Sequence, residues 1–373
     1  MKVLVNISRV IVGILFIFSG LVKANDPHGL SYKMQEFFAV WANDPSLKTF
    51  MNWLSVYALP FSIIMITLEI IVGVGLLLGN WRKFFTTLLL ILIIFFAFLT
   101  GYAVLSGKIA TCGCFGDCIP LTSLQSFLKD LVLLALILIL FFGRKYIHPI
   151  LGPNANTSIL VVSCILVLFY QWHVMRHLPT VDCLPFKKGG NILQLRNMPA
   201  DAVPDKKGYR FIYEKNGKKE NFTIKDLPDS SWNFVSREDF IIEKGKDNEP
   251  PIKDFYLTTL SGSDTTEAVL SLDASYYLFF VKDFSETDRW FDNFKNIYNN
   301  AVKNNMRVCV VTPEAAQAGN FFNSQNVLNL TILSLDATSF KTAARTDPEL
   351  YLMKGPIIKN KWGWADFKNV LKN

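Results

Sequence analysis

The sequence predicts a membrane-spanning all-α bundle that is followed by a soluble α/β region. Three observations support this expectation. Of the 373 residues, 51% are hydrophobic and the mean hydropathy is positive, which is too apolar for a single soluble fold. The apolar residues are concentrated before residue 175, in runs close to the roughly 20 residues that cross a bilayer. Beyond residue 205 the pattern changes to short strand-like and helix-like runs.

Five segments are long and apolar enough to span the membrane. Four form the predicted bundle and the fifth follows it, over residues 3–22, 58–79, 84–105, 124–142 and 157–174. The first has the basic start of a signal peptide, but Lys23-Ala-Asn-Asp is not a small-residue cleavage site, so we expect a retained helix. Between the first two spans, apolar residues at helical spacing predict an outer surface helix over residues 31–57.

A net charge of +7 could indicate a nucleic-acid-binding protein, but the distribution of the charged residues along the chain argues against this interpretation. Residues 1–175 carry 11 Lys and Arg against 6 Asp and Glu, and the remainder carries 27 against 25. The unbalanced basic residues lie at alternate span ends, at Lys2, Arg9, Arg82, Lys83, Arg144 and Lys145. The positive-inside rule therefore places the N-terminus in the cytoplasm and the chain beyond the fifth span outside. The lipid bilayer is the expected partner of the first half.

The region after the fifth span is expected to be soluble. Around Asn216-Gly217 the alternating pattern predicts a hairpin. From about residue 250 the order is strand, helix, strand, helix, strand, hairpin and helix, which is a thioredoxin-like arrangement. We divide the chain into bundle, fifth helix, linker, small β region and α/β domain, over residues 1–145, 157–174, 175–204, 205–249 and 250–373.

The segment CGCFGDC places Cys112, Cys114 and Cys118 in the outer connection between the third and fourth spans. A disulfide between the first two would close a strained ring, whereas Cys118 can reach either partner if Gly113 and Gly116 let the chain fold back. Outside a bacterial-type membrane, disulfide chemistry is permitted. Three neighbouring thiols suit disulfide exchange, but a structural bridge with a spare thiol remains open. A soft-metal site lacks a nearby fourth ligand, so no metal is expected.

Glu69 lies near the middle of the second span, where a carboxyl group must be protonated or paired. It is a candidate proton or quinone site; the alternative is a hydrogen bond that fixes helix packing. Lys129 and Asp130 are expected to be neighbours of the cysteine loop. Cys183, a lone thiol in the linker, could reach the cluster but is expected to be incidental.

The predicted α/β domain lacks the catalytic pair of a thioredoxin. A C-x-x-C motif would follow the first core strand, but the sequence there is VKDFSETDRW, with Ser285 and Asp288 near the two positions. Cys309 falls inside a strand and Cys164 inside the fifth span, where both are expected to be buried as small apolar residues. We therefore expect this domain to bind or position and not to catalyse.

The segments VGILFIFSGLVKANDP, LEIIVGVGLLLG and CGCFGDC resemble the DoxX-like superfamily, most closely its methylamine-utilisation MauE branch. The resemblance covers about residues 3–142. It implies a four-helix membrane core, an association with thiol-disulfide or quinone-linked redox processes, and site positions at Lys23, Glu69, Cys112 and Cys114. From about residue 250 the chain resembles thioredoxin-like proteins of the TlpA/MauD kind. There PPIKDFYLTTLSG matches the entry strand and Pro348 the cis-proline.

These observations favour a redox-associated, multi-pass protein of the bacterial inner membrane with a periplasmic C-terminal domain. Cys112, Cys114 and Cys118 would exchange disulfides or mature proteins at the outer face, in one version linked to a membrane quinone near Glu69, and the C-terminal domain would dock periplasmic clients. The alternative is a non-enzymatic scaffold or assembly factor with a structural disulfide and a partner-binding C-terminal domain. Metal handling is the weakest interpretation.

Overall fold

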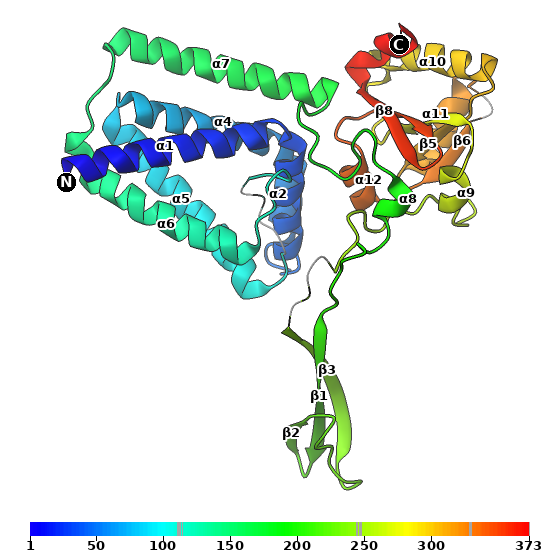
Figure 1. Ribbon diagram of the computed structural model, residues 1–373, viewed down its shortest axis with the longest axis horizontal. Coiled ribbons are helices and arrows are strands. Elements are labelled where there is room, and N and C mark those ends of the chain that lie inside the picture. Colours follow the sequence, from blue (N-terminus) through cyan, green and yellow to red (C-terminus); the bar gives the residue numbers. More distant parts are fainter. Residues whose placement is uncertain (110–112, 114, 244, 246–247, 328–329, 373) are drawn as a thin grey trace.

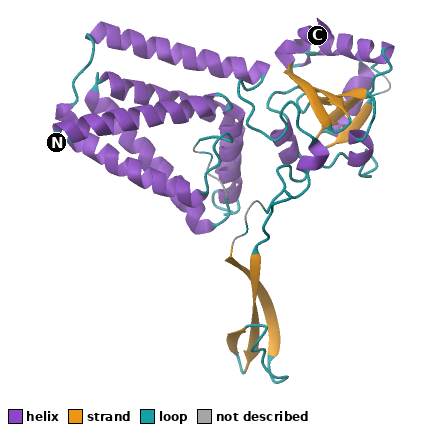
Figure 2. Ribbon diagram, viewed as in Figure 1, coloured by secondary structure: helices purple, strands orange, loops and turns teal. Residues whose placement is uncertain are grey.

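The computed structural model describes residues 1–373 except 110–112, 114, 244, 246–247, 328–329 and 373. Three parts can be followed in Figure 1: a helical membrane bundle, a C-terminal α/β domain beside one end of it, and a β-sheet that projects away from both. Figure 2 shows that strands occur only in the last two parts.

Among the described residues, five helices have the length and composition to cross a membrane, which confirms the five predicted spans. They are α1 (Lys2–Ala24), α4 (Ala58–Leu78), α5 (Arg82–Ser106), α6 (Ser123–Phe142) and α7 (Pro153–His177). Helix α1 packs along α4, α5 packs along α6, and α7 lies against α4 on the outside of the bundle (Figure 1). The bundle core includes Val12, Val72, Leu89 and Ile137.

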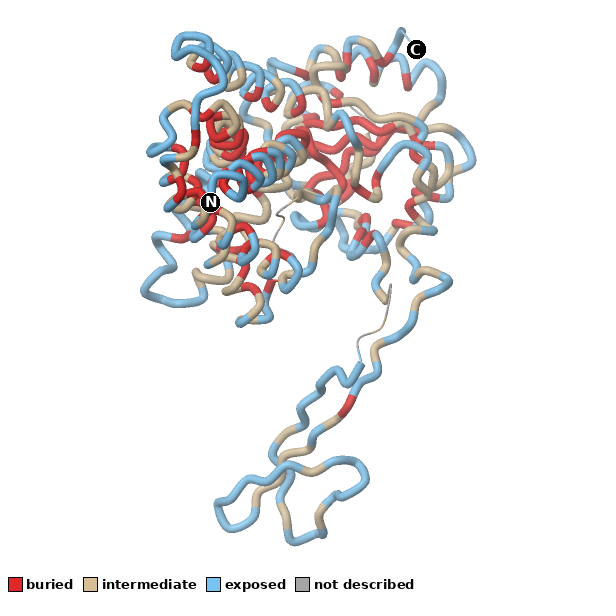
Figure 3. The backbone as a smooth tube through the Cα atoms, turned by 60° about the vertical axis from the view of Figure 1, so that its left-hand side comes forward, coloured by how far each residue is buried: buried red, intermediate tan, exposed pale blue. Residues whose placement is uncertain are grey.

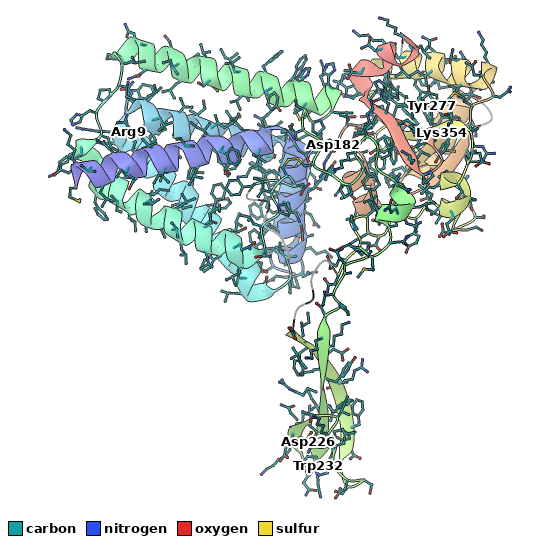
Figure 4. The ribbon with its side chains drawn as sticks, viewed as in Figure 1. Arg9, Asp182, Asp226, Trp232, Tyr277 and Lys354 are labelled. Atoms are coloured by element: carbon teal, nitrogen blue, oxygen red, sulfur yellow. A yellow bond between two sulfur atoms is a disulfide. The ribbon has the colours of Figure 1, made fainter. Side chains whose placement is uncertain are left out.

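The basic residues at alternate span ends lie together at one end of the bundle. Arg9 is buried there and donates hydrogen bonds to the carbonyls of Leu76, Leu77 and His148, at 2.6–3.0 Å. Figure 4 shows Arg9 at the end of α1 that is far from the C-terminal domain. Since α4 ends in carbonyls without intrahelical partners, a guanidinium at that point both satisfies them and offsets the negative end of the helix dipole.

The opposite end of the bundle carries two short helices instead of the single outer helix predicted from the sequence. These are α2 (Pro27–Trp41) and α3 (Lys48–Val56). Asp26 caps α2 by accepting a hydrogen bond from the Gly29 amide at 3.0 Å, and Pro27 occupies the first helical position. The interruption falls at Asn43-Asp44-Pro45, where an Asp and a Pro favour a turn over a continuous helix.

The C-terminal domain is built on a five-stranded mixed sheet of order β6-β5-β4-β7-β8. The strands are β4 (Ser275–Phe280), β5 (Val308–Thr312), β6 (Thr331–Ser334), β7 (Glu349–Lys354) and β8 (Ile357–Gly363). Strands β4, β5 and β6 run parallel to one another, and β7 runs antiparallel to both of its neighbours, β4 and β8. Helices flank the sheet: α9 (Thr266–Leu270), α10 (Phe291–Lys303), α11 (Ala315–Ser324), α12 (Ala337–Ala343) and a 3₁₀ helix at Trp364–Lys372. Both faces of β4 are buried, which explains its continuous apolar run.

Two segments differ from their expected form. The predicted entry strand at residues 250–262 makes only isolated bridges, from Thr258 to Asp264 and to Ser334. Within the predicted linker, Phe186 and Ile192 are buried in the core of the C-terminal domain, and the Gly189 amide donates to the carbonyl of Ile358. The short helix α8 (Ile192–Leu195) follows. Part of the segment that looked like a flexible linker is therefore packed.

The projecting sheet consists of β1 (Lys206–Lys215), β2 (Lys218–Phe222) and β3 (Asn233–Glu243), in the order β2-β1-β3. The predicted hairpin at Asn216-Gly217 is present, and both residues have positive φ, as a two-residue turn requires. Figure 3 shows that most of this sheet is exposed.

Candidate functional site

The membrane bundle contains a cavity of about 710 Å³. It is enclosed by α1, α4, α5 and α6 and covered by α2. Its lining is overwhelmingly apolar and aromatic and includes Phe16, Phe37, Met65, Phe96, Leu99 and Leu133. Three lining residues, Phe61 and Ile64 of α4 and Phe95 of α5, are exposed. The cavity is therefore open to its surroundings beside these residues.

Lys23 and Glu69 form an ion pair at this cavity. The Lys23 ammonium lies 2.5 and 2.8 Å from the two carboxylate oxygens, and both side chains are buried. Helices α1 and α4 lie close together beside the pair, since a Cβ at Gly20 would overlap Ile70 Cγ1 and lie 3.4 Å from Glu69 Cβ. From the sequence we expected Glu69 to be either protonated or paired, and the structure shows it paired with Lys23. Lys23 is also one of the site positions that the family resemblance implies.

A second polar group lines the same cavity. Asp130 is fully buried, accepts a hydrogen bond from Thr100 Oγ1 at 3.0 Å and pairs with the Lys129 ammonium at 2.7 Å. The Lys129 ammonium also lies 5.2 Å from the ring centroid of Phe115, within the cysteine loop. Gly113 and Phe115 of that loop contribute to the cavity wall. Lys129 and Asp130 are therefore neighbours of the cysteine loop, as expected.

The cysteine pairing differs from the sequence-based expectation. Cys118 forms a disulfide with Cys183, with a Cα–Cα distance of 4.8 Å, so the interpretation of Cys183 as incidental is wrong. The loop after α5 and the segment after α7 leave the bundle at the same end, which brings these two thiols together across 65 residues. Cys112 and Cys114 lie outside the described residues. Cys309 is buried in β5, and burial raises its pKa to about 11.

The C-terminal domain contacts the end of the bundle that carries α2 through ion pairs that sequence reasoning missed. Arg345, with only 4% of its side chain exposed, pairs with Asp26 at 2.7 Å and with Asp117 at 2.6 Å. Lys361 pairs with Asp182 at 2.9 Å and with Glu349 at 3.4 Å. No local motif marks these residues. The one available signal was that Asp117 and Asp182 each precede a cysteine of the disulfide.

Burial and charge act in opposite directions on the two cations. Burial by itself would lower the pKa of Arg345, but the carboxylates of Asp26 and Asp117 outweigh it and raise the pKa. For Lys361 burial is likewise outweighed by Glu349 and Asp182, and the pKa is raised. Both cations therefore keep their charge in the contact. Opposite charges at these distances favour the ionised form.

The segment after β4, which would hold C-x-x-C in a thioredoxin, contains Lys282, whose charge acts on His28 of α2. Asp347 accepts hydrogen bonds from the amides of Lys282 and Asp283, at 2.9 and 3.1 Å, and burial raises its pKa to about 6. The Asp347–Pro348 peptide bond is cis, as expected from the resemblance. Half-buried His28 of α2 lies opposite; burial, then Arg345 and Lys282, lower its pKa to about 4. Ser285 and Asp288 offer no thiol here.

Comparison with known proteins connects the bundle to one family. Residues 1–143, which include α1 to α6, match the family model of methylamine utilisation protein MauE, and residues 208–244 match a domain family of unknown function. Protein TlpB of Flavobacterium psychrophilum is 29% identical over 137 residues, which cover 36% of this chain and 35% of that protein. The match thus spans about a third of this curated relative. No solved structure matches the chain. The first part of the chain is therefore similar to MauE-type membrane proteins.

Proposed function

We propose that this protein is a thiol–disulfide redox protein of the bacterial inner membrane that exchanges reducing equivalents with a lipid-soluble quinone. One observation carries the proposal: the same open cavity is lined both by the cysteine loop, through Gly113 and Phe115, and by the buried ion pair of Lys23 and Glu69. The similarity of residues 1–143 to MauE supports a redox or maturation role. In this proposal the N-terminus is cytoplasmic and the C-terminal domain periplasmic.

The residues at the cavity fit a quinone. A volume of about 710 Å³ lies within the range of small-molecule pockets, and the aromatic lining suits a substituted ring with an isoprenoid tail directed toward the lipid. The Lys23 ammonium has three N–H donors and can keep Glu69 while donating to a carbonyl oxygen. The Asp130 carboxylate, which accepts from Thr100 Oγ1, can accept a hydrogen bond from a hydroxyl of the reduced quinol. A bound quinone would supply a two-electron acceptor at this site.

The thiol chemistry is proposed for the cysteine loop. A dithiol loses two electrons and two protons as it becomes a disulfide. Cys112 and Cys114, together with the disulfide of Cys118 and Cys183, provide the thiols for exchange, in which a thiolate attacks one sulfur and the other leaves as a thiolate. We further propose a thioredoxin-like fold for residues 250–373. Without C-x-x-C, that domain acts by positioning.

The disulfide also favours a second candidate function. Because Cys118 and Cys183 join the bundle to the segment that leads into the C-terminal domain, the bridge could serve only to hold the two parts together. In that case the protein is a non-enzymatic assembly factor of the membrane, and its C-terminal domain recruits client proteins at the outer face.

The two functions are separated by a quinone-oxidation experiment. Full-length protein is reduced, freed of reductant, placed in lipid nanodiscs without oxygen and mixed with decylubiquinone, and disulfide formation is followed by thiol alkylation and mass spectrometry. We expect one quinone reduced for each disulfide formed. Leu99→Trp, which fills the cavity, should abolish this reaction, whereas Ile91→Trp on the lipid-facing side of the same helix should not. Disulfide formation that does not depend on the quinone, or that also occurs in the Leu99→Trp variant, would favour the assembly factor.

A further inference from the structure

The disulfide of Cys118 and Cys183 is held between two ion pairs to the C-terminal domain. Each cysteine follows an aspartate in the sequence, and each of these aspartates pairs with a buried cation of the domain. Asp117 pairs with Arg345 and Asp182 with Lys361. Only 4% and 9% of the two cationic side chains are exposed. Figure 4 shows Asp182 at the junction of the bundle and the C-terminal domain.

The two cations belong to one rigid part of the C-terminal domain. Fully buried Glu349, at the start of β7, accepts hydrogen bonds from the amides of Arg345 and Thr346, at 2.7 and 3.2 Å, and pairs with Lys361. Lys361 lies on the neighbouring strand β8, opposite Tyr351. Asp26 at the start of α2 adds a second carboxylate to Arg345. We name these six residues, Asp26, Asp117, Asp182, Arg345, Glu349 and Lys361, the docking cluster.

We propose that the docking cluster stabilises the disulfide form of Cys118 and Cys183 relative to the dithiol form, so that the C-terminal domain sets the redox equilibrium of this pair. The reverse coupling follows: reduction of the disulfide loosens the domain from the outer end of the bundle. This inference goes beyond the proposed function, because it needs neither a quinone nor the chemistry of Cys112 and Cys114.

The physical reason is positional. A disulfide requires its two Cα atoms to lie about 4.4–6.8 Å apart. The ion pairs of Asp117 and Asp182, the residues that precede the two cysteines, hold the cysteines near this separation and so raise the effective concentration of one thiol at the other. Separating either ion pair would leave a buried cation of the domain with fewer carboxylates to balance its charge, which is costly. The cluster therefore opposes the movement of Cys118 away from Cys183 that reduction of the disulfide would allow. Coupling between two equilibria is reciprocal, so whatever docking contributes to the disulfide, the disulfide contributes to docking.

The redox step is an ordinary thiol–disulfide exchange. A dithiol protein, or two molecules of glutathione in the test below, gives up two electrons and becomes a disulfide. The bond between the sulfurs of Cys118 and Cys183 breaks, and each sulfur gains one electron and one proton. The docking cluster takes no part in the electron transfer. Arg345 and Lys361 are therefore positioning residues.

The test measures the redox equilibrium of the full-length protein in lipid nanodiscs. Glutathione buffers of graded potential are used, and the oxidised fraction of Cys118 and Cys183 is read by differential alkylation. We expect Arg345→Gln and Lys361→Gln each to shift the equilibrium about tenfold toward the dithiol, which for a two-electron couple is about 30 mV. The control Arg289→Gln removes a cation whose side chain is 51% exposed and whose partner, Glu286, lies outside the cluster. It should change nothing.

Two further measurements keep the result decisive if a core variant folds poorly. Asp117→Asn and Asp182→Asn change the bundle side of each pair, where the side chains are partly exposed, and should shift the equilibrium in the same direction. Hydrogen exchange of residues 341–349 should quicken when the disulfide of the unaltered protein is reduced. Equilibria within twofold of the unaltered protein in folded Asp117→Asn and Arg345→Gln would overturn the inference. A failed quinone experiment would leave it standing.

Discussion

The ion pair of Lys23 and Glu69 gives the sharpest prediction for the membrane bundle. Replacing Lys23 by Met leaves a carboxylate without its partner, and replacing Glu69 by Gln leaves an ammonium without its partner. Both groups are buried at the cavity, where water cannot replace the lost partner. Lys23→Met and Glu69→Gln should therefore both destabilise the bundle.

The size of each loss can be worked out from the geometry. At 2.5 Å and an effective dielectric constant near 20, the gross attraction is about 7 kcal/mol, and removing one partner of such a buried pair typically costs about 3–5 kcal/mol.

The double variant Lys23→Met/Glu69→Leu contains neither charge, so no buried charge is left without a partner. It should therefore lose less stability than either single variant.

The assay is unfolding of the purified full-length protein in mixed micelles by dodecyl sulfate, followed by the circular dichroism of its helices. Lys33→Met is the control, because it breaks a pair with Glu36 in which both partners are partly exposed, and it should cost less than about 1 kcal/mol. Single variants as stable as Lys33→Met, or a double variant less stable than both single variants, would refute the reasoning.

Three further predictions concern the pH dependence of stability, one buried thiol and the membrane topology. Between pH 6.5 and 4, His28 takes up a proton in the unfolded chain but not in the folded chain, where its pKa is about 4, so His28 lowers stability on acidification. The pKa of Asp347 is raised from 3.8 to about 6 in the folded chain, so Asp347 has the opposite effect and raises stability on acidification. Relative to the unaltered protein, His28→Gln should therefore gain thermal stability as the pH falls from about 6.5 to 4.5, and Asp347→Asn should lose it. Cys309, buried and with a pKa of about 11, should resist iodoacetamide at pH 8 in the folded protein, and rapid alkylation would contradict its placement. Reporter fusions after Lys145 and after the C-terminus should lie on opposite sides of the membrane, and a shared side would remove the positive-inside assignment.

Much of the fold was predictable because its determinants are local. The apolar runs of α1, α4, α5, α6 and α7 are long enough to be recognised one at a time. Asn216-Gly217 marks its hairpin because few other residues tolerate positive φ at both positions. The buried strands β4 and β5 read as apolar runs because both faces of the sheet are covered. For Glu69, burial in a span was enough to predict that it needs a partner.

The partners themselves depended on tertiary structure. Cys118 meets Cys183 across 65 residues, and Arg345 meets Asp117 across 228. In the sequence, Arg345 is one arginine among 38 basic residues, and Cys183 is a lone thiol beside prolines and lysines. The sequence by itself determined which segments enter the membrane and which form strands, because hydrophobic periodicity and turn chemistry act over a few neighbouring residues. Only the tertiary structure decided which charges and thiols face one another, because a short-range contact between distant residues leaves no periodic trace in either segment.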